Sequence, residues 1–294
     1  MLDGAVAIVT GAGRGLGRAE ALELASHGAR VVVNDLGVTV DGTPGAEHPA
    51  QQVVEEIKAS GGEAVAHDGD VADFDQARDL IRLAVDTYGD LNILVNNAGI
   101  LRDRMVFNMS PEEWDAVLKV HLRGHFCTSR WAAAYWRDRS KDTDGPAYGR
   151  VINTSSEAFL FGAPGQPNYA AAKMGIVGLT YSCANALGRY GVTVNAISPG
   201  AATRMTDSVP TERRTARAGA DEWSPDNVAP VVAYLASERS GWITGRVVHS
   251  SGYEVALYSN PEPVVRVIGS GPWDVDDLAA QVERSFGPLL GRTR

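Results

Sequence analysis

Short apolar runs alternate with longer amphipathic stretches along most of the chain. The apolar runs are rich in β-branched residues and lie at 6–10, 30–35, 93–97, 150–155, 192–198 and 246–251. Between them, apolar residues recur at helical spacing in stretches such as 17–28, 50–61 and 75–89. Continuous apolar strands that alternate with helices predict a parallel sheet covered by helices on both faces. We therefore expect an α/β protein with one doubly wound parallel sheet.

No linker or internal repeat divides this pattern, which favours a single Rossmann-type domain over residues 1–252. Residues 253–294 are less regular, and we interpret them as a C-terminal extension of the same domain, either a substrate lid or a subunit contact. Asp274 is a candidate N-cap for a helix in this extension. The apolar residues that would share one face of the helix are Val275, Leu278, Val282 and Phe286. That face needs a partner in the same subunit or in another.

The composition narrows the class of protein. The chain has 294 residues, a formal net charge of −9 and an isoelectric point near 5.2, so it is a poor candidate for binding nucleic acid or anionic membranes. No apolar run reaches the roughly 18 residues of a membrane span, and the first strand begins too early for a cleavable signal peptide. Cys127 and Cys183 stand apart from any Cys/His cluster, which predicts reduced thiols and no metal site. We expect a cytoplasmic protein.

The first apolar run leads into the glycine-rich sequence TGAGRGLG at residues 10–17. A turn from a strand into a helix presents free N–H groups and the positive end of the helix dipole, and both favour a pyrophosphate. The spacing is T-G-x-x-x-G-x-G and departs from G-x-G-x-x-G, because a leucine stands where the third glycine would fall. We predict nucleotide binding here. The alternative is an ordinary turn, since turns are often rich in glycine without binding a ligand. The candidate cofactor contacts are Gly11, Arg14, Gly15, Leu16 and Gly17.

Asp35 ends the second apolar run, eighteen residues after Gly17. This distance is close to the roughly twenty residues expected for an acid that binds the ribose hydroxyls of adenosine. Its charge would repel a 2′-phosphate, which predicts NAD as the cofactor and not NADP. Arg14 is evidence against this choice, since an arginine in the loop could pair with that phosphate. A capping or turn aspartate is the structural alternative.

The sequence QPNYAAAKMG at 166–175 places a tyrosine and a lysine four residues apart among alanines. On a helix, Tyr169 and Lys173 would lie on one face. A neighbouring ammonium favours the phenolate and lowers the tyrosine pKa from its ordinary value near ~10. Such a tyrosine is a usable base for removing a proton from an alcohol. A surface Tyr/Lys pair is the alternative.

These features occur in one order along the chain: TGAGRGLG, then NNAG at 96–99, then Ser156, then Tyr169 and Lys173. In this combination the chain resembles the short-chain dehydrogenase/reductase family, over nearly all of its length to about residue 252. The resemblance implies an oxidoreductase that transfers hydride between a nicotinamide cofactor and a secondary alcohol or ketone. It also implies a homodimer or homotetramer.

The resemblance assigns roles to further residues. Ser156 lies thirteen residues before the tyrosine and would donate to the substrate oxygen, with Ser155 as the alternative. Lys173 would also bind the nicotinamide ribose. His121 stands where many relatives carry an asparagine that supports a water chain, and histidine can also bond water and titrate near neutrality. A proton-relay role and a packed core histidine are the two interpretations of His121.

Other positions match the family's cofactor contacts. The remaining candidates are Asp70 and Val71 for the adenine, Asn97, Ala98 and Gly99 in NNAG near the adenosine ribose, and Pro199, Gly200, Ala202 and Thr203 near the nicotinamide. The segment after Thr203 is one residue shorter than the usual pattern, which weakens that assignment.

The substrate is indicated by finer similarities. The sequences VVVNDLG, NNAGILRDR, VHLRGHF and SPGAATRMT resemble the (3R)-hydroxyacyl-CoA dehydrogenase unit of peroxisomal multifunctional enzyme type 2, which also acts on 17β-hydroxysteroids. A 3-hydroxyacyl-CoA, including steroid-derived ones, is therefore the expected substrate. A free hydroxysteroid or another lipophilic alcohol is the first alternative, and a non-catalytic NAD-binding regulatory module is the second. The cations that would meet a CoA ester are Arg204, Arg213, Arg214 and Arg217, with a solvated helix face as the alternative.

Overall fold

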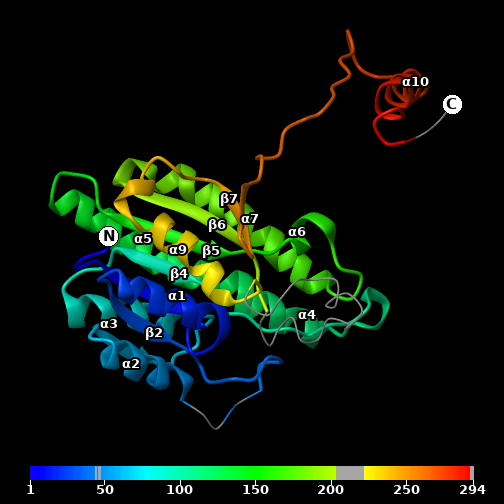
Figure 1. Cartoon of the computed structure of the whole chain (residues 1–294). Coiled ribbons are helices and arrows are strands. Elements are labelled where there is room, and N and C mark those ends of the chain that lie inside the picture. Colours follow the sequence, from blue (N-terminus) through cyan, green and yellow to red (C-terminus); the bar gives the residue numbers. More distant parts are fainter. Residues whose placement is uncertain (44, 46–47, 203–221, 292–294) are drawn as a thin grey trace. The chain divides into compact units, whose positions relative to one another are not determined.

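The computed structural model of the chain describes residues 1–43, 45, 48–202 and 222–291 (Figure 1). Thr203 and the four arginines predicted to meet a CoA ester lie outside the described residues. The chain forms two compact units, Met1–Tyr258 and Ser259–Arg294.

Within the described residues of the first unit, eight strands form one sheet in the order β3-β2-β1-β4-β5-β6-β7-β8. The strands are β1 (Val6–Thr10), β2 (Arg30–Asn34), β3 (Ala64–His67), β4 (Ile93–Asn96), β5 (Gly149–Thr154), β6 (Val192–Gly200), β7 (Val247–Ser251) and β8 (Glu254–Leu257). Neighbouring strands are parallel except β8, which pairs antiparallel with β7. The predicted doubly wound α/β sheet is confirmed, and β8 adds an antiparallel edge.

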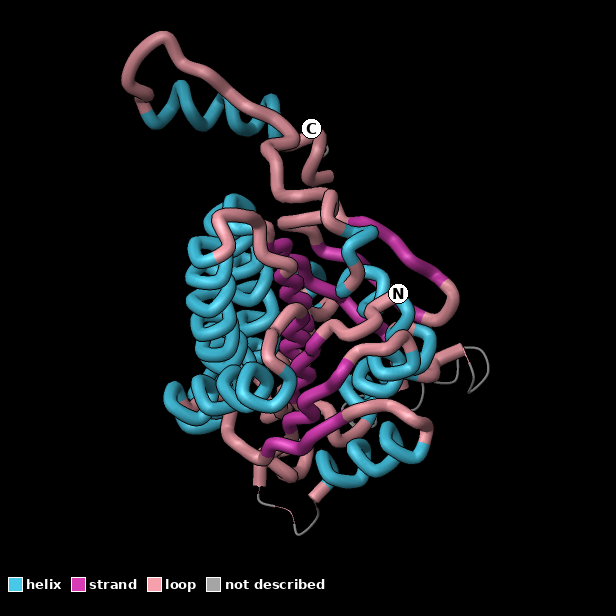
Figure 2. The backbone as a smooth tube through the Cα atoms, turned by 90° about the vertical axis from the view of Figure 1, so that its left-hand side faces the viewer, coloured by secondary structure: helices cyan, strands magenta, loops and turns pink. Residues whose placement is uncertain are grey.

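Helices connect the strands and cover the sheet. They are α1 (Gly15–Ser26), α2 (Pro49–Ala59), α3 (Phe74–Tyr88), α4 (Pro111–Leu118), α5 (Gly124–Asp142), α6 (Ala158–Phe161), α7 (Pro167–Leu187) and α9 (Ala229–Ala236). Single helical turns are η1 (Val106–Asn108), η2 (Lys119–Arg123), η3 (Gly188–Tyr190), η5 (Pro225–Asn227) and η6 (Glu238–Ser240). Figure 2 shows the strands running between helices on either side.

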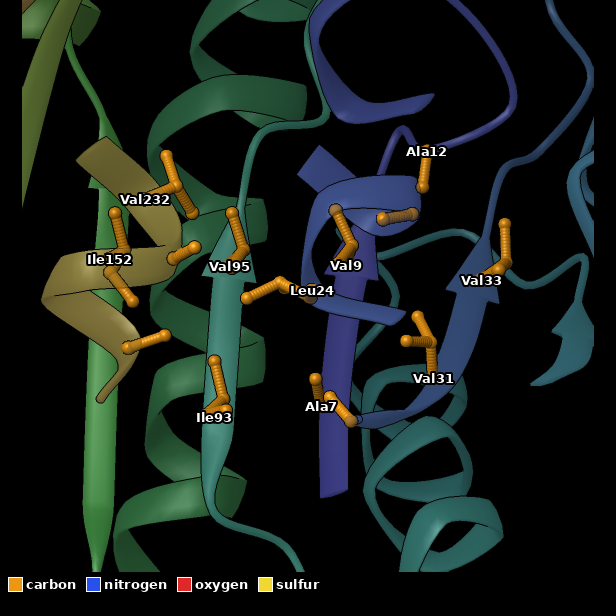
Figure 3. Close-up of a cluster of buried hydrophobic side chains, with 14 of the residues drawn as sticks. Ala7, Val9, Ala12, Leu24, Val31, Val33, Ile93, Val95, Ile152 and Val232 are labelled. Carbon is orange, nitrogen blue, oxygen red and sulfur yellow. The ribbon is translucent and has the colours of Figure 1, made fainter. Parts of the chain in front are cut away.

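Side chains of each central strand alternate between two apolar cores. In β1, Ala7 and Val9 join the core beneath α1, α2 and α9, while Val6 and Ile8 join the core beneath α3, α5 and α7. Figure 3 shows the first core, with Leu24 of α1 lying against the sheet. Because both faces are covered, the strands read as continuous apolar runs. The burial of these side chains fixes where each strand ends and therefore where its following loop begins.

The second unit contains α10 (Val275–Phe286). Asp274 caps it as predicted, because its carboxylate accepts hydrogen bonds from Asp276 N at 2.9 Å and Asp277 N at 3.4 Å. The described residues of this helix include no buried side chain. In the part of the chain that the structure covers, none of the helices has the length and apolarity required to span a membrane.

Candidate active site

Loops at the carboxyl ends of the parallel strands carry the predicted site residues. The glycine-rich turn follows β1, Asp35 follows β2, the NNAG sequence begins at Asn96, the last residue of β4, and Ser156 follows β5. In doubly wound sheets this edge is where ligands bind. Parallel pairing of β1 with β2 and β4, and of β4 with β5, brings these loops side by side.

Tyr169 and Lys173 lie one turn apart near the start of α7. The Lys173 Nζ atom lies 5.3 Å from the centroid of the Tyr169 ring, so the two side chains share one face as predicted. Lys173 is 2 % exposed, and its Nζ donates to the carbonyl oxygen of Thr154 at 2.7 Å. Burial lowers the pKa of Lys173 to about 7. The pKa of this buried lysine therefore lies close to neutral pH.

Burial has the opposite effect on the tyrosine. It raises the pKa of Tyr169, a hydrogen bond with the Ser156 side chain lowers it, and the charge of Asp103 raises it. The lowered tyrosine pKa that the sequence predicts from the neighbouring ammonium is wrong, because burial raises the pKa of Tyr169. Tyr169 is consequently a phenol at neutral pH, and the phenolate forms more readily as the pH rises.

The two serines after β5 have different partners. The Ser155 hydroxyl is buried and donates to the main-chain oxygen of Lys173 at 3.1 Å, so it ties β5 to α7. The Ser156 hydroxyl accepts from Ala158 N at 3.3 Å, and the Ser156 side chain lies close enough to Tyr169 to lower the pKa of the phenol. Of the two, Ser156 is therefore the serine that lies with Tyr169, while Ser155 has a structural contact.

His121 packs edge-on against the Tyr169 ring, with 5.2 Å between ring centroids and an interplanar angle of 87°. It sits in η2, a π-helical turn between α4 and α5, and is 1 % exposed. Its Nε2 lies 3.2 Å from Ile100 N and 2.9 Å from Ile100 O, so either tautomer finds a main-chain partner. Burial, and then the charge of Lys173, hold the pKa of His121 well below its usual range. The sequence suggests that His121 titrates near neutrality, and the lowered pKa argues against this. The relay role stays a prediction.

Gly99 makes this placement of His121 possible. A Cβ atom on Gly99 would lie 2.2 Å from His121 Cε1, a distance at which the ring would have to move. Gly99, predicted as a cofactor contact, therefore also has a packing role. A further buried histidine, His125, lies one turn after His121, and burial lowers its pKa to about 3. The sequence alone does not single out His125, because a lone histidine in an apolar helix carries no signature.

The glycine-rich turn is built for close backbone approach. Gly11 and Gly15 have φ angles of +62° and +53°, a region that favours glycine. A Cβ atom on Gly17 would lie 2.4 Å from Gly11 O and 2.5 Å from Asn97 Nδ2. No side chain caps the N-terminus of α1, which begins after Arg14, so the helix end presents its N–H groups at this turn. The turn fits a diphosphate group, and Leu16 packs against the first core.

Asn97 joins the glycine-rich turn to the loop after β4. Its Nδ2 donates to Thr10 O and Gly11 O, each at 3.1 Å. The Thr10 hydroxyl accepts from Asn97 N at 3.0 Å and from Ala98 N at 3.2 Å. Asn97 and Ala98 therefore lie against the glycine-rich turn, and Thr10, the first residue of that motif, holds both of them there.

Asp35 is held in place by two main-chain donors. Its carboxylate accepts from Gly13 N at 2.9 Å and from Gly37 N at 2.8 Å. The carboxylate therefore lies directly beside the glycine-rich turn, where the resemblance implies the adenosine ribose. The same two bonds are those expected of an aspartate that stabilises a turn, which is the structural alternative. Asp35 therefore has a structural contact and also lies at the predicted binding position.

The other predicted contacts fall at the same edge. Asp70 pairs with Lys119 at 3.3 Å, and Val71 is buried against Gly124. Pro199 and Gly200 end β6, and a Cβ atom on Gly200 would lie 2.4 Å from Ser251 Oγ. The main-chain N–H of Ala202, the last described residue before the gap, donates to Trp223 O at 2.7 Å. Within the described residues, no group of three or more His, Cys, Asp or Glu side chains is placed to hold a metal ion.

The fold and this site define a nicotinamide-dependent oxidoreductase, and a family model described as short chain dehydrogenase matches residues 5–214. The chain belongs to the short-chain dehydrogenase/reductase family.

Its relatives include a hydroxyacyl-CoA dehydrogenase and a peroxisomal multifunctional enzyme. It is 50% identical over 292 residues to hydroxyacyl-CoA dehydrogenase ChsB1 of Mycobacterium tuberculosis, covering 97% of this chain and 89% of that protein. It is 44% identical over 236 residues to peroxisomal multifunctional enzyme type 2 of Drosophila melanogaster, covering 80% of this chain and 37% of that protein. The crystal structure of a short chain dehydrogenase from Mycobacterium avium matches with a TM-score of 0.84 and 48% identity, over 100% of this chain and 96% of the other.

Proposed function

We propose that the chain is an NAD-dependent dehydrogenase that interconverts a 3-hydroxyacyl-CoA, including steroid-derived ones, and the corresponding ketone. The observation that carries the reaction is the buried Lys173 Nζ, 5.3 Å from the Tyr169 ring, together with the Ser156 side chain, whose interaction with the phenol lowers its pKa. A hydroxyl donor, a titratable phenol and a cation in one place are the groups needed to bind an alcohol oxygen and remove its proton. A non-catalytic module would have no use for this arrangement.

Each residue has a distinct task in this proposal. Ser156 donates a hydrogen bond to the substrate oxygen and stabilises negative charge on it. Tyr169 accepts the hydroxyl proton during oxidation and returns it during reduction. Lys173 is anchored on Thr154 O and, while it is protonated, supplies a positive charge beside the phenol that favours the ionised form. NAD, when bound, supplies the acceptor for the hydride that leaves the carbinol carbon.

The residues that would hold NAD come from the segments after β1, β2, β3 and β4, from the end of β6 and from α7. The turn at 10–17 and the end of α1 would bind the diphosphate. Asp35 would bind the adenosine ribose, with Asp70, Val71 and the segment 97–99 around the adenosine. Lys173, Pro199, Gly200 and Ala202 would lie near the nicotinamide end, as would Thr203, which is outside the described residues.

The substrate class rests on the similarity to hydroxyacyl-CoA dehydrogenase ChsB1, which extends over 97% of this chain. The test is the rate of NADH formation with a panel of 3-hydroxyacyl-CoA esters of increasing length and a panel of free hydroxysteroids. We expect kcat/KM for the best CoA ester to exceed that for every free alcohol by at least about tenfold, because the CoA moiety adds binding energy. Equal or higher kcat/KM for a free hydroxysteroid would replace the proposed substrate by the lipophilic alcohol.

The preference for NAD rests on the Asp35 carboxylate. We expect Asp35→Ala to lower kcat/KM for NAD by about ten- to a hundredfold, since a hydrogen bond to a charged group contributes roughly 1.5–3 kcal/mol. The same change removes the repulsion of a 2′-phosphate, so the NADP-to-NAD ratio of kcat/KM should rise. Asp35→Asn is the second variant, because it keeps the side-chain shape and removes the charge, although its amide nitrogen can no longer accept from one of the two main-chain donors. If the NADP-to-NAD ratio of kcat/KM is unchanged in both variants, Asp35 only stabilises the glycine-rich turn and does not select the cofactor.

We propose further that the protein is a homodimer or homotetramer. Exposed apolar side chains on one group of helices and their adjoining turn support this assembly. They include Phe107 of η1, Trp114 of α4, Phe126 of α5 and Met174 of α7, with exposed fractions of 75%, 37%, 48% and 48%.

A further inference from the structure

The N-terminus of α7 is capped from inside the helix. The residue before the helix, Gln166, makes no side-chain cap, and Pro167 has no N–H group to satisfy. The first N–H groups of a helix lack helical partners and need others. Tyr169 N donates at 2.8 Å to the side-chain Oδ1 of Asn168, the residue directly before it. Asn168 therefore fixes the main chain at the residue that carries the phenol.

The same side chain binds two other segments of the protein. Asn168 Nδ2 donates to Arg102 O at 3.0 Å, in the loop after β4, and to Glu113 O at 3.1 Å, in the first turn of α4. Asn168 is completely buried, and both amide hydrogens and the amide oxygen are used. The bond to Tyr169 N thus belongs to a junction at which this one buried amide group binds all three segments.

The loop after β4 is itself held at both ends. At its start, the main chain of Ile100 contacts His121, whose ring packs against Tyr169. At its end, Arg104 N donates to Gly165 O at 2.8 Å, just before α7. Because the loop begins directly after the NNAG sequence, Tyr169 is tied to the predicted cofactor side of the site through main-chain bonds. Its main chain is held by Asn168 and its ring by His121.

We propose that Asn168 is a positioning residue for the reaction. It holds Tyr169 at the position where the phenol meets both Ser156 and Lys173. This inference rests on the proposed function, because it assigns Asn168 a role in the chemistry of Tyr169. A misplacement of about 1 Å in a reacting group costs on the order of a hundredfold in rate, so the loss of this junction should be visible in kcat.

The first test compares Asn168→Ala with Thr180→Val. Thr180 is completely buried in the same helix, donates to Ile176 O at 2.8 Å and accepts from Asn153 Nδ2 at 2.9 Å, but it lies three turns beyond Tyr169. We expect Asn168→Ala to lower kcat by about ten- to a hundredfold with a smaller change in the KM for NAD. Thr180→Val should lower Tm and leave kcat within about twofold at a temperature where both variants are folded. Equal effects of the two variants on kcat would overturn the inference.

The second test uses Asn168→Asp, which keeps the acceptor for Tyr169 N and removes the two donors. When ionised, the new carboxylate faces the oxygens of Arg102 and Glu113, and when protonated it can donate to one of them. Burial and these oxygens raise the pKa of the new carboxyl group. The ratio of kcat between Asn168→Asp and wild type should therefore rise several-fold as the pH falls. A ratio independent of pH would count against the inference, even if Asn168→Ala does not fold.

The two proposals fail in different ways. If wild-type protein oxidises no hydroxyacyl-CoA or other alcohol with a nicotinamide cofactor, the proposed function fails. If wild type turns over and Tyr169→Phe does not, while both Asn168 variants keep wild-type kcat and pH dependence, only the positioning role fails.

Discussion

Replacing Tyr169 with phenylalanine is expected to lower kcat for alcohol oxidation by about 10²- to 10⁴-fold, the contribution typical of a general base. The change removes one oxygen atom and keeps the ring that packs against His121. It also removes the interaction of the phenol with the Ser156 side chain. The fold should persist, because the ring contributes most of the packing.

The pH dependence adds a second signature to this variant. Because burial raises the pKa of Tyr169, the wild-type oxidation rate should increase as the pH rises toward that pKa. The increase should be absent from Tyr169→Phe. Tyr181→Phe is the matched control, since Tyr181 lies in the same helix and is partly buried in another cluster. A Tyr169→Phe enzyme with wild-type kcat would refute the assignment of the base.

Replacing Lys173 with methionine is expected to lower kcat by at least about 10²-fold. The change removes the cation beside the phenol and the hydrogen bond to Thr154 O while retaining most of the side-chain volume. Steady-state kinetics at saturating cofactor and substrate measures the loss. Lys58→Met, at an exposed position near the end of α2, is the control and should leave kcat unchanged.

The same lysine makes stability depend on pH. The folded-state pKa of Lys173 is about 7, below its ordinary value of 10.5, because burial disfavours the ammonium. Between these two values the unfolded chain binds more protons at this residue than the folded chain does. The penalty is therefore largest below about pH 7, on the order of a few kcal/mol, and disappears as the pH rises toward 10.5.

Urea unfolding of wild type and Lys173→Met tests this linkage. The wild type should gain unfolding free energy relative to the variant as the pH rises from about 7 to about 10. Lys58→Met should run parallel to wild type over the same range. Parallel curves for wild type and Lys173→Met would mean that Lys173 is not desolvated in the folded protein.

The sequence predicts most of the sheet because its strands are buried on both faces. The run at 6–10 coincides with β1, and the other five predicted runs match strands within one or two residues at either end. Two strands were not predicted. The strand β3 has the sequence AVAH with valine as its single β-branched residue, while three of the four residues in the edge strand β8 are exposed.

The predicted site residues lie together for a reason that the sequence shows only in part. The order of the motifs and the four-residue spacing between Tyr169 and Lys173 can be recognised in the sequence alone. The contacts of Asn168 and the π-helical turn at His121 cannot, because their partners are main-chain atoms of loops far away in the sequence. Electrostatics also depends on the fold, since the pKa of Tyr169 follows from burial and not only from its neighbour in the helix.

The account rests on hydride transfer from a 3-hydroxyacyl-CoA to NAD at Tyr169, and one assay addresses it directly. The assay measures NADH formation from a (3R)-3-hydroxyacyl-CoA by wild type and by Tyr169→Phe, with NADP in place of NAD in a parallel series. We predict rapid turnover with NAD, slower turnover with NADP, and a loss of at least about 10²-fold in the variant. Turnover that is equal in wild type and Tyr169→Phe, or no turnover of any CoA ester by wild type, would contradict the account.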